Sequence, residues 1–218
     1  MNKSIKKIIA PLLQKLTHDN SFDSRLHGDL ETHFNQTEGM INLAEAALLY
    51  DLAKACREGC IVEVGSYRGR SAVALGRGSL DGHNAAVYAI EPHEEFTGLL
   101  GGKFGPPDRA AFYTAMLATS CYHTVRLVNL SSEIVAPGWT QKIGLLFIDG
   151  DHSYAGVKRD FDCWSPHLTP NALIAFDDST DPALGPRQLI DELRQGGQFE
   201  QVRQVRNVTV ITRKSGMS

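Results

Sequence analysis

The chain has 218 residues, of which 42% are apolar and 22% are charged. This length suits one globular domain with a short attachment, and the apolar content is too high for a disordered chain. The net charge of −3, from 22 basic and 25 acidic side chains, excludes the strongly basic surface of a typical nucleic-acid-binding protein.

The first 38 residues are polar and rich in histidine, with a basic start and one short apolar segment at Ile8–Leu16. Pro11 and Lys15 interrupt that segment and no small-residue cleavage site follows, so we do not expect a secretory signal. No run of about 18 apolar residues occurs, so we expect no membrane partner and a soluble, cytoplasmic protein. Residues 1–38 are expected to form a helical and irregular arm, and residues 39–218 the main domain.

Helical and extended patterns alternate from Gly39 onward. Helices are expected at 41–56, from 71–75, and at 110–121, 156–168 and 185–195. Short apolar runs predict strands at 61–65, 86–91, 125–130, 143–149 and 172–178, and a closing hairpin at 199–205 and 208–213. This alternation predicts the α/β class: a doubly wound, mostly parallel, seven-stranded Rossmann-like sheet with one antiparallel strand in the C-terminal hairpin.

One connection in this pattern is unusually long. Residues 92–109 contain the glycine- and proline-rich stretch GLLGGKFGPPDR, which exceeds an ordinary strand-to-helix loop. Loops of this kind often cover a binding site. We therefore expect a lid-like loop at 92–109 that helps to shape the substrate site.

The cysteines favour a reducing compartment. Cys56, Cys60, Cys121 and Cys163 form no CxxC pair and have no histidines at zinc-site spacing. We expect ordinary free thiols, in keeping with a cytoplasmic location.

Acidic or small polar residues follow all five strands expected before the hairpin. The strand ends carry Glu63-Val64-Gly65-Ser66, Glu91, Ser131-Ser132-Glu133, Asp149-Gly150-Asp151-His152 and Asp177-Asp178. Because the carboxyl ends of parallel strands meet at one edge of the sheet, these side chains should line a common ligand site.

The first two strand ends suggest a nucleoside. Gly65 and Gly69 permit a tight turn close to a ligand, before a helix whose first N–H groups are free. Glu91 stands one βαβ unit later, where an acid accepts hydrogen bonds from ribose hydroxyls. The alternative is a helix-capping glycine turn and a solvated acid, because the middle glycine of GxGxxG is missing.

The last two strand ends suggest a metal. Asp149, Asp177 and Asp178 would repel one another at one edge unless a cation neutralised them or they shared a proton. Carboxylate oxygens with waters suit Mg²⁺ or a similar hard divalent cation. The alternative is that Asp178 caps a helix and Asp149 holds a turn.

These motifs resemble the class I S-adenosylmethionine-dependent methyltransferases, in particular the metal-dependent O-methyltransferases that act on sugars, natural products and catechols. IVEVGSYRGRSA, FIDGDHSYAGVKRDF and LIAFDD carry the resemblance, which spans about residues 39–213. It implies a methyltransferase version of the Rossmann-like fold, S-adenosylmethionine and Mg²⁺ as cofactors, and a small-molecule hydroxyl substrate. Residues implied in cofactor binding are Glu63, Gly65, Ser66, Gly69, Ser71, Glu91, Ser132, Glu133 and Asp149, and the implied metal ligands are Asp149, Asp177 and Asp178. The sequence departs from catechol-type enzymes by ending the ligand set with Asp-Asp rather than Asp-Asn.

The same resemblance implies a general base just after the first metal aspartate, either His152 or Asp151. His152 is the first choice because an imidazole with a pKa near ~6.5 suits proton transfer at neutral pH. A cation that contacts two vicinal hydroxyls would aim one of them at the methyl group. The expected activity is divalent-metal-assisted O-methylation of one hydroxyl of such a pair.

Other readings remain open. A nicotinamide-dinucleotide oxidoreductase could use a similar sheet, and a non-catalytic relative could keep only the cofactor pocket. A cephalosporin-hydroxylase-like or glycosylation-pathway member of the same motif group is a further alternative. A homodimer is a possible assembly because symmetric dimers are the commonest oligomers.

Overall fold

The computed structural model describes residues 22–214 and contains one seven-stranded sheet in the order β5-β2-β1-β6-β7-β9-β8. The strands are β1 Cys60–Val64, β2 Val87–Ile90, β5 Val125–Val128, β6 Ile143–Ile148, β7 Leu168–Phe176, β8 Phe199–Val205 and β9 Val208–Arg213. β9 runs antiparallel to both β7 and β8, whereas the other neighbouring pairs are parallel. The predicted fold class, including the antiparallel strand in the C-terminal hairpin, is confirmed.

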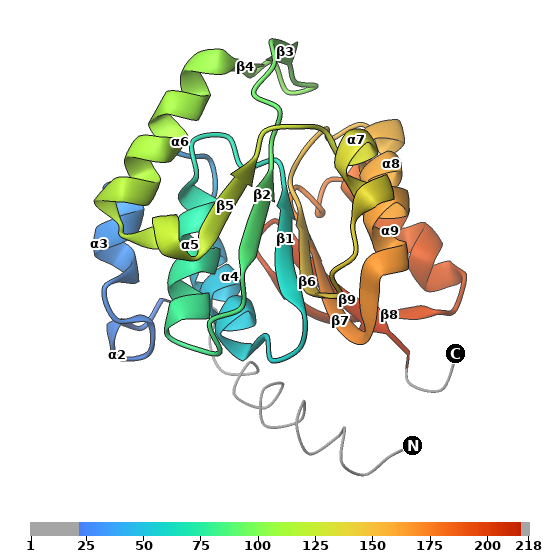
Figure 1. Ribbon diagram of the computed structural model, residues 1–218. Coiled ribbons are helices and arrows are strands. Elements are labelled where there is room, and N and C mark those ends of the chain that lie inside the picture. The colour runs from blue at the N-terminus through green and yellow to red at the C-terminus, as the bar shows by residue number, and fades with distance from the viewer. Residues whose placement is uncertain (1–21, 215–218) are drawn as a thin grey trace.

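Helices cover both faces of the sheet (Figure 1). One face packs against α4 Leu43–Ala55, α5 Arg70–Leu80 and α6 Pro106–Ala118, and the other against α8 Tyr154–Trp164 and α9 Gly185–Gln195. Successive residues of β1 enter opposite cores: Ile61 belongs to the first and Val62 to the second, as the period of two in a strand requires. Each face therefore has its own apolar core, and the ligand edge lies between the two helical layers.

The sequence explains where individual helices begin. Asn42 accepts hydrogen bonds from the first turn of α4, and Glu45 returns one to the Asn42 N–H, which completes a capping box. Pro186 stands in the first turn of α9, where a missing N–H costs nothing. Helix α6 begins at Pro106 rather than at the predicted Ala110 for the same reason.

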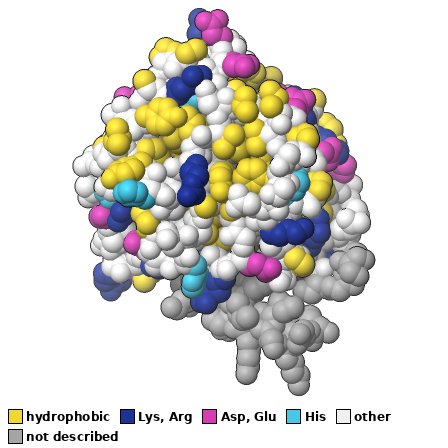
Figure 2. Space-filling view, in the orientation of Figure 1, with side chains coloured by type: hydrophobic (Ala, Val, Ile, Leu, Met, Phe, Trp, Pro, Cys, Tyr) yellow, Lys and Arg dark blue, Asp and Glu magenta, His cyan; other side chains and the backbone are white. Residues whose placement is uncertain are grey.

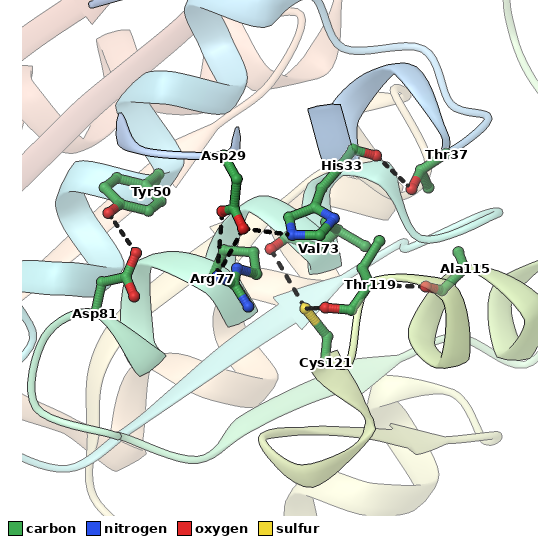
Figure 3. Close-up of polar contacts among 10 residues, drawn as sticks. All are labelled: Asp29, His33, Thr37, Tyr50, Val73, Arg77, Asp81, Ala115, Thr119 and Cys121. Carbon is green, nitrogen blue, oxygen red and sulfur yellow. Dashed lines mark hydrogen bonds and ion pairs between the residues drawn. The ribbon is translucent and has the colours of Figure 1, made fainter. Parts of the chain in front are cut away.

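Two short helices precede the main domain, α2 Ser24–His27 and α3 Leu30–Asn35. Asp29, at the start of α3, accepts hydrogen bonds from Arg77 of α5 and lies 3.1 Å from the His33 ring, as Figure 3 shows. Leu30 is buried in the first core. Residues 22–38 are thus packed on the domain, and the predicted segment Ile8–Leu16 lies outside the described residues.

The long connection after β2 is more ordered than a plain loop. It contains a small hairpin of β3 Phe96–Thr97 and β4 Lys103–Phe104, which stands above the carboxyl ends of the strands in Figure 1. Figure 2 views the molecule from the same side as Figure 1, and hydrophobic side chains are spread among charged ones over its upper part. A covering role for residues 92–109 stays a prediction. Among residues 22–214, no helix combines the length and apolar character needed to cross a bilayer.

Candidate active site

A cavity of about 320 Å³ opens at the carboxyl edge of the sheet. Its walls come from the ends of β1, β2, β6 and β7, from residues 39–41 before α4, and from the hairpin of β3 and β4. The predicted site residues that line it are Gly65, Ser66, Ser71, Glu91, Ser132, Asp149, Asp151, His152, Asp177 and Asp178. Glu63, Gly69 and Glu133 are not in its lining.

The turn after β1 requires its glycines. Gly65 has φ +82°, and a Cβ there would lie 2.2 Å from the carbonyl oxygen of Asp149 on the neighbouring strand end. Gly69 has φ +94° and precedes α5, where a Cβ would press against Phe112 and Met116. Only glycine permits both the backbone conformation and these approaches, so the loop from 65 to 69 is fixed close to the end of β6.

Glu91 holds this loop in place. Its Oε2 accepts hydrogen bonds from the N–H groups of Ser66 and Tyr67, each at 3.2 Å, and its Oε1 accepts one from His93 at 2.9 Å. A carboxylate oxygen can accept more than one hydrogen bond, so Glu91 retains capacity toward a ligand. The structure thus brings the predicted ribose acid to the predicted glycine loop, on the cavity wall.

Glu63 lies behind the cavity wall. Its carboxyl group is fully buried on the same face of β1 as Ile61, and neither oxygen has a well-aligned hydrogen-bond partner in the part of the chain that the structure describes. Burial raises the pKa of Glu63 to about 8; the nearby Ser71 hydroxyl works against the shift, and the charge of Glu91 adds to it. Glu63 can therefore act on a ligand only from behind the loop.

The three predicted metal ligands meet at the ends of β6 and β7. Burial raises the pKa of Asp149 well above its ordinary value, and the charges of Glu63 and Asp178 raise it further. Burial likewise raises the pKa of Asp177, helped by Asp149 and Asp178, and one Asp177 oxygen is buried without a partner among the described residues. Asp178 adopts φ +45°, which turns the chain sharply after β7. These carboxyl groups are close enough to repel, as the sequence predicts.

His152 stands between two of these carboxylates. Its Nε2 lies 3.5 Å from Asp149 Oδ1, and its Nδ1 lies 3.5 Å from Asp178 Oδ2. Asp151 is engaged elsewhere, because it accepts hydrogen bonds from the Ser153 N–H and hydroxyl, both at 2.9 Å, at the start of α8. Of the two predicted bases, His152 has the ring nitrogens nearer the acid cluster, whereas Asp151 supports a helix terminus.

The two predicted residues that follow β5, Ser132 and Glu133, point in different directions. Ser132 begins the short helix α7 Ser132–Val135, which the sequence pattern did not predict, and its hydroxyl accepts a hydrogen bond from Trp164 at 3.0 Å. Glu133 points to solvent and lies 3.7 Å from Arg159. Asp160, which lines the cavity near Ser132, was not among the predicted residues; burial raises its pKa. The motif FIDGDHSYAGVKRDF, which contains Asp160, was the signal that could have identified it.

The donor set suits a divalent cation by its chemistry. Asp149 and Asp177 have raised pKa values, and within residues 22–214 one Asp177 oxygen is buried without a partner. A positive charge placed among these groups and Asp178 would stabilise their ionised forms. Within residues 22–214, however, no three His, Cys, Asp or Glu side chains are already arranged as a metal-binding group. The metal site stays a prediction.

Solved structures share this fold over nearly the whole chain. A methyltransferase from Podospora anserina bound to SAH (S-adenosylhomocysteine) matches with a TM-score of 0.64 and 17% identity, covering 99% of this chain and 97% of that one. The O-methyltransferase TomG from Streptomyces achromogenes, in complex with SAM, matches with a TM-score of 0.58 and 15% identity, covering 97% and 96%. An O-methyltransferase from Bacillus cereus in complex with SAH gives 0.59 and 15%, covering 95% and 94%.

A family model described as "Methyltransferase domain" matches residues 62–179, which is more than half of the chain. The matched range begins inside β1 and ends just after Asp178, so it includes the glycine loop, Glu91 and the acid cluster. The resemblance to methyltransferases inferred from the motifs is thereby confirmed. The chain belongs to the methyltransferase domain family.

Proposed function

We propose that this protein transfers a methyl group from S-adenosylmethionine to a hydroxyl of a small molecule, with a divalent cation assisting. The observation that carries the proposal is one cavity that joins the glycine loop and Glu91 to the acid cluster around His152. The first group suits a nucleoside, and the second suits activation of a hydroxyl. A methyl donor and an acceptor would therefore meet within a single pocket.

The donor side has defined roles. Gly65 and Ser66 would border the methionine part together with Ser71 at the start of α5, and Glu91 would hold the ribose. Ser132 would lie at the adenine, and Glu63 and Gly69 would support the loop from behind. The proposal is supported by the SAM and SAH complexes of the Streptomyces, Podospora and Bacillus proteins of the same fold.

The acceptor side supplies a proton acceptor. Methyl transfer from a sulfonium to oxygen is an in-line displacement, so the oxygen must lose its proton as the new bond forms. His152 would take that proton on one ring nitrogen, and Asp149 or Asp178 would stabilise the resulting imidazolium. Asp151 is the second choice, because its oxygens are occupied by Ser153.

A divalent cation would be held by Asp149, Asp177 and Asp178. When bound, such a cation supplies Lewis-acid polarisation, which lowers the pKa of an acceptor hydroxyl and fixes its position. An acceptor with two vicinal hydroxyls could use both for this purpose, which is the reason we propose such a pair. The role of this chain's own residues is to orient the acceptor beside His152.

Binding of SAH tests the donor side. We expect calorimetry to show saturable binding to the wild type, and Glu91→Gln to weaken it about tenfold because one acceptor for ribose is lost. Arg187→Gln is a matched control, since within residues 22–214 Arg187 pairs only with Asp191, its half-exposed neighbour on α9. Fluorescence titration with NADH tests the oxidoreductase alternative: tight NADH binding without SAH binding would overturn the proposal.

A further inference from the structure

Two segments far apart in the sequence form walls of the cavity. We define the strap as residues 37–41, between α3 and α4, and the hairpin as residues 96–104, which includes β3 and β4. Gly39, Met40 and Ile41 of the strap and Phe96 and Phe104 of the hairpin line the cavity. We propose that Arg68, in the glycine loop, is a positioning residue that couples donor binding on this loop to the ordering of both walls.

The strap folds around the side chain of Arg70, which is the first residue of α5. The Arg70 guanidinium donates to the carbonyl oxygens of Thr37 and Gly39, both at 2.7 Å, and of Ile41 at 3.4 Å. It also lies 4.4 Å from the centre of the Phe34 ring. A Cβ at Gly39 would approach the Arg70 Cβ to 2.4 Å, so glycine is needed for this close contact. The strap is therefore bonded directly to the first residue of α5.

Arg68 contacts the strap and also Asp108, in the first turn of α6 just after the hairpin. Its Nε donates to Asp108 Oδ1 at 2.7 Å, and its Nη1 donates to Glu38 of the strap. Asp108 is buried, with a side chain only 6% exposed, whereas Glu38 is 72% exposed. A guanidinium has donors in a fixed planar fork, so one arginine can hold two carboxylates in a defined relation. Lysine lacks this geometry.

Asp108 passes the contact on to the hairpin. Its other oxygen, Oδ2, accepts the Gly105 N–H at 2.9 Å, directly after β4 and at the start of α6. Tyr67 makes a second connection, because its ring contacts Phe104 edge to face with centroids 5.2 Å apart. The Arg68 guanidinium also lies 5.0 Å from the Tyr67 ring centre. The base of the hairpin is thus attached to the glycine loop through consecutive residues.

This arrangement has a direct consequence for binding order. A ligand that fixes the loop from 65 to 69 also fixes Arg68, and through Arg68 it restricts the strap and the hairpin base. Because these segments line the same cavity, an acceptor would meet more ordered walls once the donor is bound. The inference rests on the proposed function, because it takes the methyl donor as the ligand of this loop.

Hydrogen exchange with and without SAH tests the coupling. In the wild type we expect SAH to slow exchange at 65–71, at the strap and at 96–105, by about fivefold or more. In Arg68→Gln we expect protection to persist at 65–71 and to fall by about half at both walls, because the Arg70 and Tyr67 contacts remain. Glu38→Gln should reduce the SAH effect at the strap, where the Arg70 contacts remain, and leave it unchanged at 96–105, because Asp108 still pairs with Arg68. Arg187→Gln should behave as the wild type.

The outcomes separate two failures. If SAH protects 65–71 in Arg68→Gln and both walls respond as in the wild type, the coupling is wrong and the proposed function stands. If SAH protects no part of 65–71 in the wild type, the proposed function fails and the coupling with it. A merely structural role for Arg68 would speed exchange in the free protein and leave the SAH-induced change intact, which also contradicts the coupling. Because Glu38 is exposed, Glu38→Gln keeps the test decisive if Arg68→Gln does not fold.

Discussion

The two sides of the cavity differ in how well their charged groups are paired. On the side of β1 and β2, three charged groups near the cavity have partners: Arg68 bridges two carboxylates, Arg70 donates to three carbonyl oxygens, and Glu91 accepts three N–H groups, whereas the buried Glu63 behind them stands apart. On the side of β6 and β7, Asp149 and Asp177 have raised pKa values, and an Asp177 oxygen has no partner among residues 22–214.

The difference indicates that the two sides of the cavity have different functions. A wall whose main charged groups are paired keeps its backbone arrangement, so donor binding need only damp the motion of that wall. A crowded, under-paired wall is destabilising by itself and becomes favourable only when a proton or a cation joins it. We infer that the first side positions the donor and that the second side carries the chemistry. The predictions below test this contrast from the largest expected effect to the smallest.

Replacement of His152 tests the chemical side. With an acceptor found by screening polyhydroxylated compounds, we expect His152→Ala to lower kcat about 10²–10⁴-fold, because the proton acceptor is lost. Asp151→Asn should have a smaller effect, since Asp151 mainly supports the start of α8. The measurement is kcat against pH for both variants. An unchanged kcat for His152→Ala would remove this residue from the mechanism.

Glu63 gives a pH dependence with a defined sign. Its pKa is about 8 in the folded protein and 4.5 as a model value, so between these pH values the folded state binds more protons than the unfolded state. The free energy of unfolding should therefore fall as pH rises through this window, by a total of about 2–3 kcal/mol after relaxation of the site. Glu63→Gln should flatten that slope.

Urea unfolding of both proteins at pH 5, 7 and 9 provides the measurement. The difference between them should be greatest at pH 9. An equal slope in the two proteins would show that Glu63 is not the source of the pH dependence.

Asp108 tests the paired side. Asp108→Asn removes the charge that Arg68 contacts and weakens the cap on Gly105, so we expect the free energy of unfolding to fall by about 1–3 kcal/mol. Asp162→Asn is the matched control: Asp162 pairs with Lys158 but is half exposed, so its loss should cost about 0.5 kcal/mol or less. Urea unfolding compares the two variants. Equal, small losses would mean that the Arg68 contact adds no stability.

The fold followed from local pattern because its central strands are short apolar runs that alternate with helical patterns. Ile143–Ile148 and Val208–Arg213 are recognisable by composition alone, and Pro186 and Asn42 mark helix starts by their own chemistry. The hairpin of β3 and β4 was missed, because strands of two residues leave no periodic signal. Helix α7 was missed for the same reason.

The site was predictable where it depends on strand ends and unpredictable where it depends on long-range pairs. Gly65, Glu91 and Asp149 were placed correctly on the cavity wall, because parallel strands bring their carboxyl ends together. The partners of Arg68 lie 30 and 40 positions away, and nothing in the local sequence identifies Glu38 or Asp108 as those partners. Of the two alternatives Ser132 and Glu133, only Ser132 lines the cavity, since a short helix turns Ser132 inward and Glu133 outward.

The contrast between the two walls is tested most directly by thermal unfolding of the wild type and Asp177→Asn, each with and without Mg²⁺. We expect Mg²⁺ to raise the unfolding midpoint of the wild type, because binding to the folded state alone stabilises it. Without Mg²⁺, Asp177→Asn should unfold at a higher temperature than the wild type, since one repelling carboxylate is gone, and Mg²⁺ should not raise its midpoint further. A less stable Asp177→Asn variant, or a wild type whose midpoint is indifferent to Mg²⁺, would contradict the account.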